Sequence, residues 1–219
     1  MTKEKLTLED EIVELRRQVD ELSAAVAAIR SPQHGKKTIK GDNVFVDSST
    51  VLVSGENATI CLGDHTKVWR GGEWTGPVTV GKRVFVNQGS YIRPLVTIED
   101  DVSLGPFVRL ITDTHEIGHK TRRTGTPKKD AIRIGQGSWI GAGATVMGGV
   151  NVGKRSIVAV GAVVNRDVPD NVLVAGVPAR VVRQIKDFDE FAELIDPFDP
   201  KSASKGADCS DSRYNNAEG

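Results

Sequence analysis

Residues 132–165 read IRIGQGSWIGAGATVMGGVNVGKRSIVAVGAVVN, and this stretch decides the fold. An aliphatic residue returns at every sixth position from Ile134 to Val164. An α-helix needs apolar spacing near 3.6 residues and a half-buried strand needs a spacing of two, so neither explains a sustained period of six. Glycine often follows the aliphatic residue and permits a tight turn. The stretch therefore predicts short strands separated by turns.

The same period, in the same phase, covers much of the chain before this stretch. Its aliphatic positions are Val80, Val86, Ile92, Ile98, Leu104, Leu110, Ile134, Ile140, Val146, Val152, Val158 and Val164. The position four residues further on is small or β-branched, at Val84, Ser90, Val96, Val102, Val108, Ser138, Ala144, Val150, Ser156 and Ala162. Three of these six-residue repeats, or hexads, would form one coil with an aliphatic side chain pointing inward at each face. We predict a mainly β fold, a parallel β-helix over residues 39–178 with roughly six coils.

The first 30 residues carry a different period. Leu8, Ile12, Leu15, Val19, Leu22, Val26 and Ile29 alternate in spacings of four and three. This heptad pattern predicts a coiled-coil helix over residues 1–30, with isoleucine or valine at the a positions and leucine at most d positions. An amphipathic helix packed on its own domain is the alternative. The polar segment 31–38 reads as a linker.

The end of the chain changes character after Val177-Pro178. Apolar residues return at helical spacing between Ile185 and Ile195, which predicts a short C-terminal capping helix over residues 179–195. A cap is expected because the open end of a solenoid exposes backbone edges and core side chains. Residues 196–219 are polar and aperiodic, and we expect them to be disordered.

Composition narrows the function classes. The 219 residues include 29 lysines and arginines and 29 aspartates and glutamates, so a net charge of zero argues against a general nucleic-acid or membrane-surface footprint. Two cysteines, Cys61 and Cys209, do not suggest a disulfide framework. No apolar run approaches 18 residues, and the first amphipathic stretch begins among acidic residues. We therefore expect no signal peptide, no membrane span and a cytoplasmic location.

The hexads lapse between Leu110 and Ile134, and this insertion, residues 111–131, contains Thr112-Asp113-Thr114-His115. Further motifs are Phe85-Val86-Asn87, Ser138-Trp139-Ile140-Gly141, NRDVPDN at 165–171 and AGVPARVVR at 175–183. Together they resemble the hexapeptide-repeat acyltransferases, in the sugar and polysaccharide O-acetyltransferase branch that includes the galactoside, maltose and nodulation-factor enzymes. The resemblance covers roughly residues 80–185. It implies a left-handed β-helix, a homotrimer with active sites between subunits, and acetyl-coenzyme A (acetyl-CoA) as the donor.

The resemblance also assigns roles on the acceptor side. A sugar hydroxyl is a poor nucleophile, so its attack on a thioester needs a base that functions near neutral pH, as histidine does. By resemblance His115 is that base, while His119 matches the motif less well. Asn87 would hold the acceptor or the reacting carbonyl, with an ordinary turn residue as the alternative.

On the donor side the resemblance places Trp139 beside the acetyl and pantetheine path. The cofactor-binding residues it implies are Trp139, Gly141, Ala142, Val160, Asn165, Arg166, Arg180 and Arg183. Guanidinium groups suit the coenzyme's phosphates. Ordinary packing of the tryptophan and solvated surface arginines are the alternatives. Val160 and Asn165 depart from the family, which usually has a smaller residue at the first position and threonine or serine at the second.

The sequence thus predicts an acetyl-CoA-dependent O-acetyltransferase acting on a hydroxyl of a sugar or polysaccharide. N-acetylation of an amino sugar and a non-catalytic trimeric scaffold are the alternatives. A γ-type carbonic anhydrase would share the solenoid but needs three histidines for zinc. The four histidines, His34, His65, His115 and His119, lack that spacing, so we predict no metal.

Two segments leave open how an acceptor would bind. Trp69 and Trp74 lie among glycines and read either as an acceptor platform or as a contact with a neighbouring subunit. Five cations follow His115, namely Lys120, Arg122, Arg123, Lys128 and Lys129. They suggest an acidic saccharide as the acceptor, with a solvated loop as the alternative.

Overall fold

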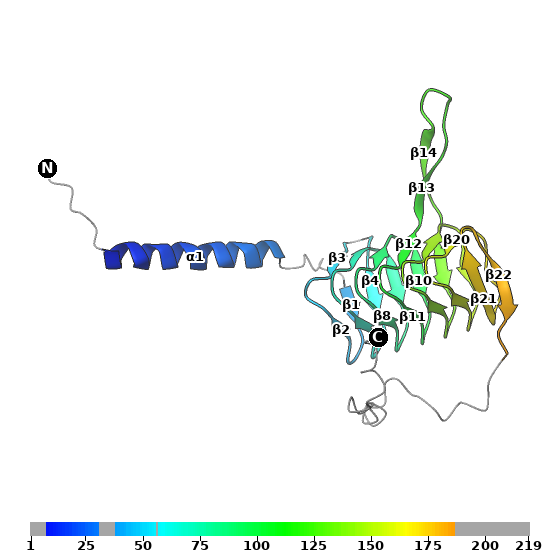
Figure 1. Ribbon diagram of the computed structural model, residues 1–219, viewed down its shortest axis with the longest axis horizontal. Helices are drawn as coiled ribbons and strands as arrows, with labels where there is room; N and C mark the ends of the chain where they lie inside the picture. The colour runs from blue at the N-terminus through cyan, green and yellow to red at the C-terminus, as the bar shows by residue number, and fades with distance from the viewer. Residues whose placement is uncertain (1–7, 31–37, 56, 187–219) are drawn as a thin grey trace, which may run out of the picture. The chain divides into compact units, whose positions relative to one another are not determined.

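The computed structural model describes residues 8–30, 38–55 and 57–186. The first range is one helix, α1 (Leu8–Arg30), and short β-strands in the others form three sheets of six to eight strands and a separate two-stranded sheet (Figure 1). Sheet A holds β1 (Thr38–Lys40), β4 (Ile60–Leu62), β7 (Val78–Val80), β10 (Val96–Ile98), β15 (Ile132–Ile134) and β18 (Asn151–Val152). Sheet B holds β2 (Phe45–Val46), β5 (Lys67–Val68), β8 (Phe85–Val86), β11 (Ser103–Leu104), β16 (Trp139–Ile140), β19 (Ile157–Val158), β21 (Val172–Gly176) and β22 (Ala179–Gln184). Sheet C holds β3 (Val51–Val53), β6 (Glu73–Thr75), β9 (Tyr91–Ile92), β12 (Arg109–Ile111), β17 (Thr145–Met147) and β20 (Val163–Val164).

Successive strands of the chain enter the three sheets in turn, and each strand pairs in parallel with the strand one coil further on. Phe85 pairs with Ser103 and Trp139 pairs with Ile157, each 18 residues apart. This register is three hexads per coil, as the period predicts. The predicted fold, a left-handed parallel β-helix, is confirmed.

The core is made by the hexad positions. All twelve aliphatic positions of the period, and the ten small or β-branched ones, are at most 3% exposed. Trp74 extends the series, since it stands six residues after Val68 and six before Val80. Its side chain is fully buried and its Nε1 donates a hydrogen bond to Ser90 Oγ at 2.9 Å. The predicted roles of Trp74 as an acceptor platform or subunit contact are therefore wrong, because its ring fills the solenoid core.

The insertion between β12 and β15 is an ordered hairpin. Strands β13 (Asp113–Ile117) and β14 (Thr124–Lys129) pair antiparallel, with His115 opposite Pro127. Figure 1 shows the hairpin projecting away from the coils. The segment predicted as an active-site loop thus forms an arm that carries His115 off the solenoid surface.

The C-terminal end corrects one prediction. Residues 179–184, expected to begin a helix, form strand β22, which pairs antiparallel with β21. The chain reverses at Gly176, whose φ of +99° favours glycine, and the β-branched Val181 and Val182 suit the strand that follows. Pairing therefore covers the edge of β21, which is part of the task expected of a capping helix. The rest of that helix, residues 187–195, and the tail 196–219 lie outside the described residues, as do residues 1–7 and 31–37.

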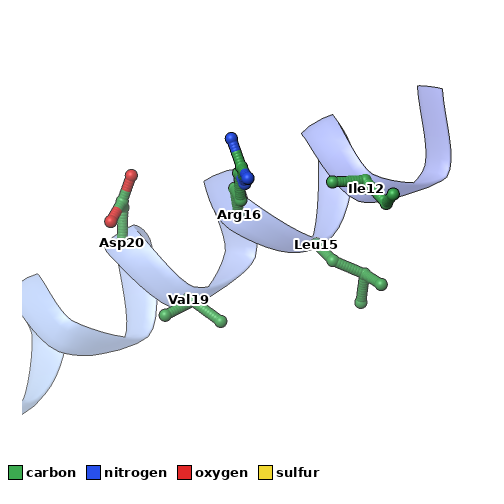
Figure 2. A pocket seen from close by; sticks show the side chains of 5 residues that line it. All are labelled: Ile12, Leu15, Arg16, Val19 and Asp20. Carbon is green, nitrogen blue, oxygen red and sulfur yellow. The ribbon is translucent and has the colours of Figure 1, made fainter. Parts of the chain in front are cut away.

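Helix α1 is confirmed from Leu8 to Arg30. Its apolar seam is open, with Ile12, Leu15, Val19 and Leu22 between 43% and 66% exposed. In Figure 2, Leu15 and Val19 point to one side of the helix and Arg16 and Asp20 to the other. Both interpretations of this helix, a coiled coil with another chain and an amphipathic helix packed on its own domain, stay predictions. Over the described ranges, no helix has the length and apolarity required for a membrane span.

Candidate active site

The outer face of sheet B carries Trp139. Because side chains alternate along a strand, burial of Ile140 turns Trp139 outward, where 53% of its surface is exposed. Ser103 and Ile157 flank it on the neighbouring strands. A large aromatic side chain therefore stands on an open face of the solenoid.

The turns beside Trp139 form a shelf of main chain. Gly141 is buried, and a Cβ atom added there would lie 2.7 Å from the Val160 nitrogen, so only glycine permits this approach of two coils. The Gly161 nitrogen donates a hydrogen bond to the Ala142 carbonyl at 2.9 Å. Val160 is the residue of the next coil that corresponds to Ala142. Val160 itself is 72% exposed. The structure thus brings four of the predicted donor-binding residues together, Trp139, Gly141, Ala142 and Val160.

Arg183 lies on the same face as Trp139. In sheet B, Trp139 pairs with Ile157, Ile157 with Leu173, and Leu173 with Arg183. Residues paired in register point to the same face, and strands are spaced by about 4.8 Å, so the two positions are roughly 14 Å apart. A linear ligand can run along this face from the tryptophan to the arginine.

The other predicted phosphate ligands lie at the end of the solenoid. Arg166 and Arg180 both line a hollow of about 170 Å³, together with Val164, Val168 and Val174. Asn165 is exposed and follows β20 of sheet C, so the structure does not bring it to the face that carries Trp139. Two of the three arginines therefore share one hollow, and the third extends the Trp139 face.

His115 is exposed on the hairpin arm, and its ring has no hydrogen-bond partner within the described residues. His119, also exposed, has its Nδ1 3.0 Å from Thr121 Oγ1. Asn87 is half-buried directly after β8, and its Oδ1 accepts a hydrogen bond from the Gln88 nitrogen at 2.8 Å. Its side-chain amide NH₂ points to no partner in the described part of the chain, so it can donate to a ligand.

Asn87 and His115 leave the solenoid at different corners. Asn87 follows a strand of sheet B, at the position that Gly141 takes two coils further on, about 10 Å away. His115 follows β12 of sheet C, on an arm that points away from the coils. One chain thus brings Asn87 to the same corner as Gly141 but does not bring His115 there.

The base of the arm is anchored by an ion pair that the sequence analysis missed. Arg93, two residues after β9 begins, holds Asp113 with its Nε at 3.0–3.1 Å from both carboxylate oxygens and its Nη2 at 2.7 Å from Oδ2. Both side chains are partly buried. The Arg93 hydrogen bonds lower the pKa of Asp113, against the opposing effect of desolvation. The pair fixes the arm two residues from His115.

Asp113→Asn should loosen the arm at pH 7. The lowered pKa of Asp113 means that the stabilisation by the ion pair is complete above the unfolded carboxyl's pKa of about 3.9 and is lost as pH falls through the lower pKa of the folded carboxyl. At pH 7 we expect less protection of the amides of residues 113–129 from hydrogen exchange in the variant, and in the wild type such a loss only in acid below that lowered pKa. Lys128→Met, which removes the local pair with Asp130, is the matched control and should change little. Equal exchange in all three proteins would contradict this anchoring.

Comparison with known proteins agrees with this geometry. A family model described as bacterial transferase hexapeptide (six repeats) matches residues 131–166. A hexapeptide-repeat containing acetyltransferase of Vibrio cholerae, solved with acetyl-CoA, is 34% identical with a TM-score of 0.54, over 57% of this chain and 71% of that one. The chain belongs to the hexapeptide-repeat acetyltransferases.

Two further members of the hexapeptide-repeat acetyltransferases carry more specific names. Galactoside O-acetyltransferase of Escherichia coli is 40% identical over 95 residues, which are 43% of this chain and 47% of that protein. A galactoside acetyltransferase solved with coenzyme A is 32% identical with a TM-score of 0.50, over 66% of this chain and 70% of that one. The chain spans about half the length of the curated relatives it matches.

Proposed function

We propose that this chain is an acetyl-CoA-dependent O-acetyltransferase that acts on a hydroxyl of a sugar or polysaccharide. The observation that carries the proposal is the outward Trp139 beside the main-chain shelf at Gly141, in a family whose members have been solved with acetyl-CoA and coenzyme A. The relatives named galactoside O-acetyltransferase favour a sugar hydroxyl as the acceptor. A cytoplasmic location remains part of this proposal.

The donor would lie along sheet B. Its thioester sits at Trp139, and its pantetheine arm crosses the turns at Gly141, Ala142 and Val160, which we call the donor shelf. Glycine and alanine leave room there, and Val160 is the one larger side chain. The phosphates reach toward Arg183 on the same face, and toward Arg166 and Arg180 at the end of the solenoid. Asn165 would contact the coenzyme only at the rim, because it follows a strand of sheet C.

The reaction needs one base and one hydrogen-bond donor. The His115 imidazole takes the proton from the acceptor hydroxyl as the oxygen attacks the thioester carbonyl. The Asn87 amide donates to the carbonyl oxygen, which carries the negative charge of the tetrahedral intermediate. As that intermediate collapses, the C–S bond breaks and the imidazolium returns the proton to the departing thiolate. The products are the acetyl ester and free coenzyme A.

The site is completed by a second subunit. His115 and Asn87 stand at different corners of one chain, so an arm from a neighbouring copy supplies the histidine.

A homotrimer provides three such interfaces, and the exposed apolar seam of α1 reinforces it. Valine and isoleucine at a with leucine at d favour dimers among isolated coiled coils, so the two signals conflict. We give priority to the solenoid, and a solution mass of two chains in place of three would contradict the trimer.

The direct test is thiol release from acetyl-CoA with a panel of pyranosides and amino sugars, followed by mass analysis of the product. We expect a gain of one acetyl group that mild alkali removes, as it removes an ester. An alkali-stable product would indicate N-acetylation. Absence of turnover with every acceptor, with acetyl-CoA bound, would favour the non-catalytic scaffold.

The acceptor is proposed to be acidic. All five cations on or beside the arm are exposed, namely Lys120, Arg122, Arg123, Lys128 and Lys129, and Lys128 also pairs with Asp130 at 3.0 Å. Reversing Arg122 and Arg123 to glutamate should raise the KM of an acidic acceptor about tenfold and leave the KM of acetyl-CoA nearly unchanged. A rise in the donor's KM instead would assign the arm to the coenzyme.

A further inference from the structure

A second aromatic site stands on sheet B, two to four coils before Trp139. Trp69 is 46% exposed and Phe45 is 48% exposed. The ring centroids of Trp69 and Phe45 are 6.2 Å apart, and those of Trp69 and Phe85 are 6.5 Å apart, both in tilted or edge geometry. With both neighbours in contact, nearly half of the Trp69 surface stays open to a ligand. The three side chains form an aromatic platform, which we define as Phe45, Trp69 and Phe85.

Polar groups flank Trp69 on both sides. Asp47, Trp69 and Asn87 take the same position in three successive coils, since their nitrogens donate in turn to the carbonyls of Val68, Val86 and Leu104 at 2.9–3.0 Å. Adjacent coils are spaced by about 4.8 Å, so a carboxylate and a carboxamide border the indole.

Both flanking groups retain hydrogen-bonding capacity. Asp47 Oδ1 accepts from the nitrogen and hydroxyl of Ser49, at 2.9 and 2.6 Å, which lowers the pKa of this carboxyl and keeps it ionised. Within the described residues its second oxygen accepts no hydrogen bond. The side-chain NH₂ group of Asn87 can likewise donate a hydrogen bond to a ligand. If this surface were instead buried against another protein, the ionised carboxylate of Asp47 would lose its water, which costs free energy.

We propose that Trp69, with Asp47, forms the subsite that holds the pyranose ring of the acceptor. One face of a pyranose presents C–H groups that pack on the negative face of an aromatic ring, and its hydroxyls project from the edge toward hydrogen-bonding neighbours. The indole of Trp69 supplies the first contact, Asp47 accepts from hydroxyls on one side, and Asn87 lies on the other. The inference rests on the proposed function, because Asn87 links this subsite to the donor shelf.

The test uses saturation-transfer NMR on the protein, with methyl β-D-galactopyranoside, methyl β-D-glucopyranoside, the acidic methyl β-D-glucuronide and acetyl-CoA as probes. Sorbitol is the control ligand, because it is a six-carbon polyol that offers hydroxyls but no ring face. We expect saturation of the C–H protons on one face of at least one pyranoside and none for sorbitol. Trp69→Ala should reduce that signal at least about fivefold, and Trp69→Phe, which keeps an aromatic face, should retain most of it.

Several outcomes would overturn the subsite. Pyranoside signals that are absent from the wild type or unchanged in Trp69→Ala would do so. A reduced solution mass of Trp69→Ala would assign the platform to a subunit contact. Acetyl-CoA in the same tube separates the two proposals. Bound acetyl-CoA without pyranoside signals refutes the subsite alone, whereas pyranoside signals without bound acetyl-CoA refute the donor and leave the subsite standing.

Discussion

His115→Ala should lower kcat by about 10²–10⁴-fold while the affinity for acetyl-CoA and the trimer persist. The loss falls on chemistry because the side chain is exposed on the hairpin arm and packs in no core, so its removal takes away a proton acceptor and little else. Steady-state kinetics with acetyl-CoA and an active pyranoside, together with calorimetric titration of acetyl-CoA, would measure the two effects separately.

His119→Ala is the matched control, since it removes the same side chain four residues further along the same arm. It should keep most of the activity, because the His119 ring contacts Thr121 and has no proton to move in the reaction. Near wild-type turnover of His115→Ala with loss in His119→Ala would transfer the role of base to His119.

Trp74→Ala should destabilise the fold by about 3–5 kcal/mol, the range for truncating a large buried aromatic side chain. The ring is fully buried, and its loss would leave a cavity beside Ser90, whose hydroxyl accepts the Nε1 hydrogen bond. Chemical denaturation would show the loss as a lower midpoint. Trp139→Ala is the control, because the same substitution at a half-exposed ring should change stability by less than about 1 kcal/mol. Equal losses in the two variants would contradict the placement of Trp74 in the core.

The core was predictable because a solenoid repeats its environment. Each coil places an aliphatic side chain at the same inward point, so one period read from residues 132–165 specifies burial from Val80 to Val164. The burial of Trp74 was not predicted, because the period was sought among aliphatic residues. Its position six residues from both Val68 and Val80 nevertheless fits the period. Its place beside Trp69 among glycines, and not its hexad position, suggested a surface role.

Other parts depend on contacts that a period does not encode. The strand β22 forms because the edge of β21 is open, whereas residues 185–195 taken alone suggest a helix. The Arg93–Asp113 pair joins residues 20 apart across a coil and a hairpin, and only the register of sheet C brings them together. The donor residues were named through motifs, and the structure adds that Asn165 stands apart from them.

The most direct test of the central proposal, a site shared between subunits, is to mix His115→Ala with Asn87→Ala. Each variant alone should be nearly inactive, since one lacks the base and the other the donor to the oxyanion. The two variants are unfolded together and refolded as mixed trimers. If each interface takes His115 from one chain and Asn87 from its neighbour, about a quarter of the interfaces then contain both intact groups. The account predicts recovery of roughly that fraction of wild-type kcat. Activity of the mixture that stays at the level of the two parents would contradict it.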